Sequence, residues 1–169
     1  MKYCQLLKDC ISDGPGVRVS IYFSGCNLHC KGCHNAVAWD FNYGQEFTKD
    51  TINEIKESLN HKYISGLTIA GGEPLQQNKR ALYKFVKEIK KEFPEKTIWL
   101  YTGYEWEQAR KSKIMKFIDV VVVGPFILEK RDISCNNKWR GSTNQRVVNV
   151  KESLKQKKQI NLLGISNNN

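Results

Sequence analysis

Apolar positions recur along the chain at two spacings, one typical of β-strands and one typical of α-helices. Four short apolar runs predict strands, and a fifth, weaker run follows them: 17–23, 64–70, 97–101, 118–123 and 146–150. Three helices are expected between these runs: one with Ile52, Ile55 and Leu59, capped by Thr48 or Asp50, one over 82–93 that ends before Pro94, and one over 105–116. Strands therefore alternate with helices along most of the chain.

This alternation predicts an α/β fold. A strand, a helix and the next strand form a right-handed unit in which the two strands are parallel. A complete eight-unit barrel needs about 250 residues, whereas this chain has 169. We therefore expect an open parallel sheet of about four to six strands flanked by helices, that is, a partial (β/α) barrel. It would occupy 1–150 as one domain, followed by a polar, basic and partly ordered tail over 151–169.

The composition is that of a globular protein. Hydrophobic residues make up 40% of the sequence and charged residues 26%, which excludes a disordered chain. The N-terminal residues contain no run suited to a signal peptide, and no stretch approaches the ~20 apolar residues of a membrane span. We therefore expect a cytoplasmic protein, whose six cysteines are metal ligands or reduced core thiols rather than disulfides.

The net charge of +10 is confined to the second half of the chain. Residues 1–78 carry seven basic and eight acidic side chains, whereas residues 79–169 carry 20 and nine. A solvated basic face and a docking surface for an acidic or nucleotide-loaded partner both fit this distribution.

The most informative motif is a group of three cysteines on the loop after the first predicted strand. Cys26, Cys30 and Cys33 form a C-x3-C-x2-C pattern. Three thiolates so closely spaced can bind one face of an iron-sulfur cube, whereas a 4Fe-4S cluster held wholly by protein takes four cysteines. One iron is then left open for a substrate or cofactor, by the logic that separates catalytic from structural zinc sites.

Two other metal sites fit parts of the same segment. Residues 30–34 match the C-x-x-C-H haem-attachment pattern, although this interpretation leaves Cys26 unexplained. A zinc knuckle of three cysteines with His29 or His34 is also chemically reasonable. The remaining cysteines lack such a spacing and are interpreted as small core residues: Cys4, Cys10 and Cys135.

Together with a second motif, the cysteine pattern resembles that of the radical S-adenosylmethionine (SAM) enzymes. Their hallmark is C-x3-C-x2-C after the first strand of a partial β/α barrel, with a glycine-rich motif for the methionyl ammonium of SAM. Here Gly71-Gly72-Glu73-Pro74 follows the second predicted strand. Glycines let backbone carbonyls approach a ligand closely, and a carboxylate complements an ammonium group.

Within this superfamily the chain is most similar to the small glycyl-radical activases, in particular those of anaerobic ribonucleoside-triphosphate reductases. The matching segments run in order through residues 1–150: 13–18, 24–26, 32–35, 47–48, 66–68, 71–74, 93–96, 99–104 and 139–146. Two positions depart from the family pattern. His34 replaces a frequent aromatic residue, although an imidazole can still stack on adenine. Val123 stands where an acidic residue is expected before Gly124, so any polar contact there is lost.

The resemblance implies a one-electron cleavage of SAM. A reduced 4Fe-4S cluster on Cys26, Cys30 and Cys33 would bind SAM at its open iron and pass one electron to the sulfonium, yielding methionine and a 5′-deoxyadenosyl radical. That radical would abstract hydrogen from the Cα of a glycine near the C-terminus of the large reductase subunit, which is the implied partner. A low-potential electron donor such as flavodoxin is implied as well, a homodimer is compatible, and neither a membrane nor nucleic acid is expected as a partner. The excess positive charge lies wholly behind the SAM motifs and is interpreted as a surface for the reductase rather than for nucleic acid.

The resemblance also assigns roles around SAM. The residues expected beside the adenosyl group are Gly32, Cys33 and His34. Those expected to hold the methionyl end are Gly71, Gly72 and Glu73. A further triplet after the third predicted strand either lines the pocket or forms a plain turn: Thr102, Gly103 and Tyr104.

Three other functions remain open on the sequence alone. A radical SAM enzyme with a small-molecule substrate shares the same motifs, although the 139–146 segment argues against it. A zinc-knuckle protein could bind nucleic acid through its basic half, with an affinity that falls steeply with salt. A plain electron-transfer iron-sulfur protein would need a fourth ligand and no SAM pocket.

Overall fold

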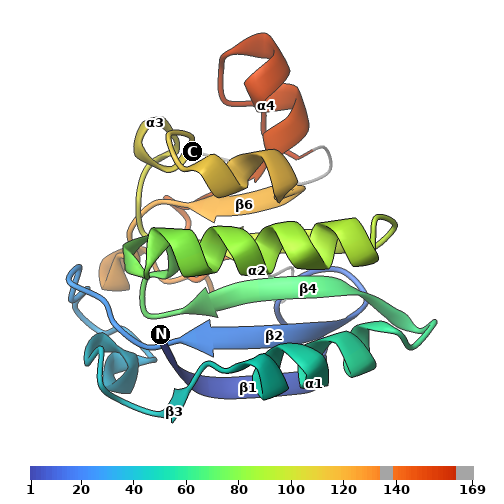
Figure 1. Cartoon of the computed structure of the whole chain (residues 1–169). Coiled ribbons are helices and arrows are strands. Elements are labelled where there is room, and N and C mark those ends of the chain that lie inside the picture. The colour runs from blue at the N-terminus through green and yellow to red at the C-terminus, as the bar shows by residue number, and fades with distance from the viewer. Residues whose placement is uncertain (134–138, 163–169) are drawn as a thin grey trace.

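The computed structural model describes residues 1–133 and 139–162, which form an α/β fold around one mixed sheet of seven strands (Figure 1). The strands are β1 (Lys2–Cys10), β2 (Val17–Phe23), β3 (Gln45–Glu46), β4 (Ile64–Gly71), β5 (Thr97–Tyr101), β6 (Val120–Val123) and β7 (Arg146–Asn149), in the order β3-β1-β2-β4-β5-β6-β7. The helices are α1 (Lys49–Leu59), α2 (Lys79–Glu92), α3 (Trp106–Ala109) and α4 (Val150–Gln156).

The predicted α/β class is confirmed, and so are most of its elements. The inner strands β2, β4, β5 and β6 are parallel and coincide with the four strongest apolar runs. Helix α1 begins after Thr48, whose hydroxyl accepts a hydrogen bond from the backbone N–H of Thr51, as the capping prediction required. Helix α2 ends at Glu92, ahead of Pro94.

The prediction of an all-parallel sheet of about four to six strands is wrong at both edges of the sheet. Strand β1 was not predicted because its exposed residues do not alternate regularly with buried ones; it pairs antiparallel with β2 and with the two-residue β3. Strand β7 was predicted, but it is antiparallel to β6. A parallel neighbour requires a crossover, usually a helix. The described part of the 124–145 connection contains no α-helix, but only the short 3₁₀ turn Leu128–Lys130 and an isolated bridge between Arg131 and Ser142.

The predicted helix over 105–116 is also wrong as a single element. It consists of the one-turn α3 and a separate 3₁₀ helix, Lys113–Phe117. Ser112 between them has an extended backbone (φ −73°, ψ 132°), which ends the helical path. The two short pieces bury Trp106 and Ile114 in the same core, so helical spacing alone could not distinguish them from one helix.

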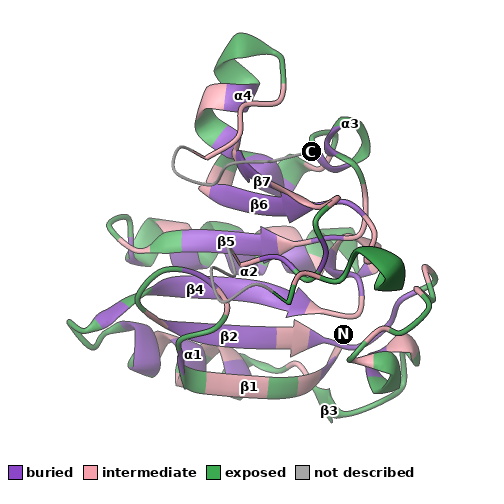
Figure 2. Ribbon diagram, turned by 180° about the vertical axis from the view of Figure 1, so that it is seen from behind, coloured by how far each residue is buried: buried purple, intermediate pink, exposed green. Residues whose placement is uncertain are grey.

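The two faces of the sheet are covered differently. Helices α1 and α2 lie on one face (Figure 1), where Val19, Ile21 and Phe23 of β2 join the main hydrophobic core. Because side chains alternate along a strand, Arg18 and Tyr22 belong to the opposite face. Figure 2 shows that this second face is crossed by loops rather than by α1 and α2.

The C-terminal part is only partly described. Helix α4 follows β7 directly, and Asn161 forms an isolated bridge with Val148. Residues 163–169 of the expected tail and Cys135 lie outside the described residues, and the boundary at residue 150 remains a prediction.

Of the other expected core thiols, Cys10 is buried and Cys4 is half-buried. No helix in the described ranges is long and apolar enough to cross a membrane.

Candidate iron-sulfur and SAM site

A cavity of about 270 Å³ lies where the parallel strands end. Since β2, β4, β5 and β6 run in the same direction, the loops after their C-terminal ends meet at one edge of the sheet, as in other α/β sites. Tyr22 and Tyr101 line the cavity from the sheet, on the face opposite to α1 and α2. The cavity is thus set between the sheet and its covering loops.

All three cysteines of the motif line this cavity. Cys26 is buried, whereas Cys30 and Cys33 are half-buried, and the loop turns back through a hydrogen bond from the Cys33 N–H to the Cys30 carbonyl (3.1 Å). Burial raises the pKa of the Cys26 thiol, and backbone N–H groups of Leu28 and His29 oppose this shift. Iron binding would displace that proton, because only the thiolate is a ligand.

The spacing of the ligating groups bears on the choice of metal. Within the described ranges, no three His, Cys, Asp or Glu side chains are placed to hold a single ion. A structural zinc knuckle needs four ligands around one ion, whereas in a 4Fe-4S cluster each thiolate binds a different iron. A zinc knuckle and a cluster therefore place different demands on the spacing of the three thiolates.

Backbone hydrogen bonds join the cysteine loop to the glycine turn after β4. The Gly72 N–H donates to the Phe23 carbonyl (2.7 Å), and the Glu73 N–H donates to the Gly25 carbonyl (2.9 Å). Consequently, the two sequence motifs are held in a fixed relation at the edge of the sheet.

The glycine pair brings bare backbone to the cavity wall. Gly71 has φ +115°, a conformation that L side chains rarely adopt. A Cβ atom on Gly72 would lie 2.5 Å from the Ala38 carbonyl oxygen and 2.6 Å from that of Gly25. Both positions thus require glycine, and the backbone here is accessible to a ligand in the cavity.

We expect Gly72→Ala to lower the free energy of unfolding by about 1–3 kcal/mol, because its methyl group meets backbone atoms that cannot move aside easily. Gly141→Ala is the matched control on the same cavity, since its nearest neighbour would be the Phe126 ring at 3.2 Å. Urea denaturation of both variants measures the difference. Equal losses would contradict the packing described for Gly72.

Glu73 lies beneath the cavity rather than on its wall. The side chain is fully buried, and its carboxylate accepts hydrogen bonds from the Leu75 N–H (3.0 Å), the Thr102 hydroxyl (2.7 Å) and the Gly103 N–H (2.8 Å). Burial raises the pKa of this carboxyl, and the three donors oppose the rise. Glu73 therefore ties the turn after β4 to the turn after β5.

The structure brings together most of the predicted site residues. The following line the cavity: Cys26, Cys30, Cys33, His34, Gly71, Gly72, Thr102 and Gly103. Three others do not. Gly32 packs against Leu128, Glu73 is buried below, and the Tyr104 hydroxyl accepts a hydrogen bond from Gln76 (2.9 Å) at a second cavity. The roles assigned to all of these residues remain predictions.

The cavity also contains residues to which no role was assigned from the sequence. Tyr22 donates a short hydrogen bond to Asp13, and both groups line the cavity together with Tyr101 and Arg140. Burial and the neighbouring Asp13 carboxylate raise the pKa of Tyr22 well above its ordinary value. The signal available in the sequence was the polar alternation of β2, which places Tyr22 on the face opposite to the core. Val123, in contrast, is buried in the core, away from the cavity.

Comparison with known families defines the class of protein to which this site belongs. The model of a family described as a 4Fe-4S single cluster domain matches residues 12–148, which include all three cysteines and the glycine turn. The chain therefore belongs to this class of iron-sulfur domains.

Individual relatives narrow this class. Proteins named anaerobic ribonucleoside-triphosphate reductase-activating protein from phage T4 and from Escherichia coli are each 38% identical to this chain, over 87% and 89% of its length and 93% and 100% of theirs. One from Haemophilus influenzae is 37% identical over 89% of this chain and 99% of its own length. The chain belongs to the family of anaerobic ribonucleoside-triphosphate reductase-activating proteins.

Proposed function

We propose that this protein is a cytoplasmic radical SAM enzyme that activates an anaerobic ribonucleoside-triphosphate reductase by forming a glycyl radical on its large subunit. The observation that carries the proposal is the meeting of the cysteine loop and the Gly71–Gly72 backbone around one cavity. Membership in the activating-protein family supports the choice of partner.

The residues present fit a site-differentiated 4Fe-4S cluster. Cys26, Cys30 and Cys33 would hold three irons, and no fourth cysteine lines the cavity among the described residues. When bound, the cluster and SAM together supply the one-electron cleavage that gives methionine and a 5′-deoxyadenosyl radical. The protein's own task is to bind the cluster and SAM, to orient SAM, and to exclude water.

The cavity wall accounts for how this chain would orient SAM. The backbone of Gly71 and Gly72 on the cavity wall is suited to the methionyl end, because carbonyl oxygens accept hydrogen bonds from an ammonium. His34 is suited to stacking on the adenine ring. Glu73 acts from below, since it holds Thr102 and Gly103 in place against the same wall.

The second face of the sheet is suited to a protein substrate. We propose that the sheet and its loops form a partial barrel over residues 1–150, with the tail from 151 outside it. Such a barrel is open on one side, and the reductase would complete it by inserting its glycine-bearing segment towards Tyr22 and Tyr101. Burial of the cavity by the partner would exclude water from the radical.

The proposal is tested by anaerobic reconstitution. The protein is loaded with iron and sulfide, reduced with dithionite and mixed with SAM, and methionine and 5′-deoxyadenosine are quantified. Equal amounts of both products are expected. A colourless protein that binds zinc and yields neither product would overturn the proposal.

A further inference from the structure

A second cavity, of about 900 Å³, lies on the helix side of the sheet. Its walls come from the N-terminal half of α2 and from the 104–114 segment. Four of its lining side chains are cationic, and among the described residues no acidic side chain lines it. We call this cavity the basic pocket and define it by Lys79, Arg80, Lys111 and Lys113.

The charges of the basic pocket are not neutralised. All four side chains are exposed, and in the part of the chain that the structure describes no carboxylate forms an ion pair with them. The two acidic residues of α2, Glu88 and Glu92, both pair with Lys56 (2.6 and 2.7 Å) near the other end of the helix. Positive potential is therefore concentrated at the pocket.

The accumulation of positive charge at the basic pocket is locally unfavourable. Lys79 and Arg80 are the first two residues of α2, where the helix dipole favours acidic residues. Beside the pocket, Lys116, Lys87 and Lys113 lower the pKa of the Tyr83 hydroxyl through a hydrogen bond and their charges. Sequences tend to break such local rules where a function requires it.

The basic pocket is connected to the cysteine loop through side chains. Tyr104 lines the pocket, and its hydroxyl accepts a hydrogen bond from the Gln76 amide (2.9 Å). The Gln76 carbonyl oxygen accepts one from the backbone N–H of Asn27 (2.8 Å), the residue after Cys26. Two hydrogen bonds thus link the pocket wall to the loop that would bind the cluster.

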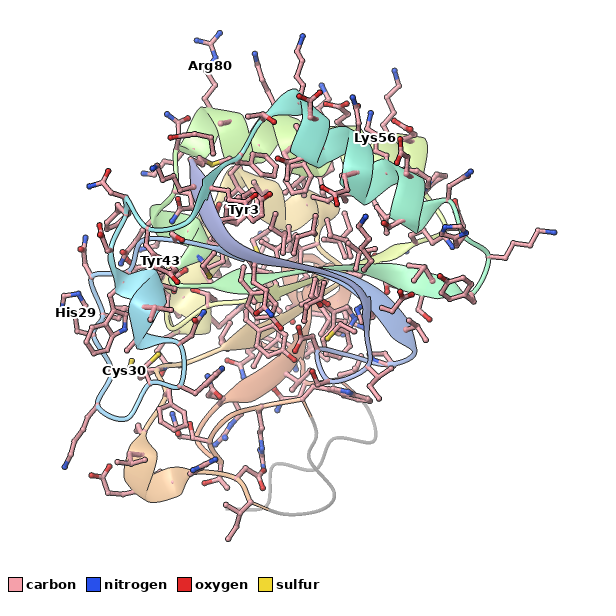
Figure 3. The ribbon with its side chains drawn as sticks, turned by 90° about the horizontal axis from the view of Figure 1, so that it is seen from below. Tyr3, His29, Cys30, Tyr43, Lys56 and Arg80 are labelled. Carbon is pink, nitrogen blue, oxygen red and sulfur yellow. The ribbon has the colours of Figure 1, made fainter. Side chains whose placement is uncertain are left out.

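The basic pocket and the first cavity, which the three cysteines line, lie on opposite faces of the sheet. Figure 3 shows Arg80 extending outward from the helix layer, while Cys30 lies on the other side of the sheet at its edge. A partner bound at the basic pocket would therefore leave the mouth of the first cavity accessible. This separation argues against the reductase as the occupant, because its glycine segment must enter the first cavity.

We propose that the basic pocket docks an acidic low-potential redox protein, which supplies the cluster with its electron while the reductase occupies the opposite face. This inference rests on the proposed function. In each encounter one electron leaves the donor, whose redox group is oxidised by one electron, and the oxidised cluster is reduced by that electron; no bond is formed or broken. Such encounters are typically weak and steered by complementary charge.

The test compares two variants of the cluster-loaded protein with equal loss of charge. In the first, Lys79, Arg80, Lys111 and Lys113 are all replaced by glutamine. In the matched control, four exposed cations on and after α4 are replaced in the same way: Lys151, Lys155, Lys157 and Lys158. Binding is measured by calorimetry with flavodoxin as the acidic probe, and reduction by the loss of visible cluster absorbance after mixing with flavodoxin hydroquinone or with dithionite.

At low ionic strength we expect the pocket variant to lose about tenfold or more in affinity for flavodoxin and in the rate of reduction by it. The control variant should stay within about twofold of wild type, and added salt should narrow the difference. Dithionite should reduce all three proteins at the same rate.

Equal flavodoxin binding and reduction by the pocket variant and by wild type would overturn the proposal. It would also be overturned if the pocket variant lost affinity for the reductase while keeping its affinity for flavodoxin. Failure of the proposed function can be distinguished from failure of the docking proposal. In the first case, the dithionite-reduced wild-type protein would leave SAM uncleaved, whatever the result with flavodoxin.

Discussion

Replacing Cys30 with alanine is expected to abolish both the iron-sulfur absorbance of the reconstituted protein and its cleavage of SAM. Cys30 is one of the three thiols on the cavity wall, and two thiolates cannot hold a cluster with a single open iron. The measurement is the yield of methionine and 5′-deoxyadenosine after anaerobic reconstitution and reduction. We expect a fall of at least about a hundredfold, to the level of protein without iron, because the cofactors carry the chemistry.

Cys10→Ala is the matched control for this variant. Cys10 is buried at the end of β1 and does not line the cavity, so we expect it to keep both the cluster and the reaction. SAM cleavage by the Cys30 variant at the wild-type rate would remove the cysteine loop from the mechanism.

Replacing Arg18 with methionine is expected to lower the free energy of unfolding by about 2–4 kcal/mol, with a loss of roughly 10 °C in melting temperature. Arg18 is fully buried on the loop-covered face, and its guanidinium donates to the carbonyls of Leu67 and Thr97 (2.9 Å each). Burial lowers the pKa of Arg18 to about 10, so the group remains charged at neutral pH. Methionine cannot donate a hydrogen bond, so both of these buried interactions would be lost.

Arg18 also fixes the turn that carries Asp13 into the cavity. Its Nε donates to the Thr68 hydroxyl (2.8 Å), which in turn donates to the Asp13 carbonyl (2.9 Å). Arg110→Met is the control. Arg110 is exposed, and among the described residues its one ion pair is with Glu107, one helical turn away, so we expect a change in the free energy of unfolding below about 0.5 kcal/mol. Thermal unfolding followed by circular dichroism separates the two, and a stable Arg18 variant would contradict the role assigned to this side chain.

The sequence was sufficient for the parallel centre of the sheet but not for its edges. β6 is an uninterrupted apolar run, and β2 alternates cleanly between Val19, Ile21 and Phe23 on one face and polar residues on the other, so periodicity identifies both. β1 has no comparable pattern, because only its partners β2 and β3 define it as a strand. The direction of β7 depends on how residues 124–145 return, which local pattern does not encode.

The candidate site could be predicted to the extent that its chemistry is local. The spacing of Cys26, Cys30 and Cys33 on one loop is visible in the sequence, and so is the glycine pair after a strand. The position of Glu73 below the wall is not, because it results from donors on Thr102 and Gly103, about 30 residues away. The second cavity could not be predicted from the sequence either, since residues 79–80 and 111–113 come together only in the folded chain.

The central claim is most directly tested by electron paramagnetic resonance of the reductase after incubation with the reduced, cluster-loaded protein and SAM. We predict a glycyl radical signal that requires SAM and is absent when the C-terminal glycine segment of the reductase is deleted. A radical of equal intensity on the truncated reductase, or SAM cleavage that never yields a radical on the intact one, would contradict the account.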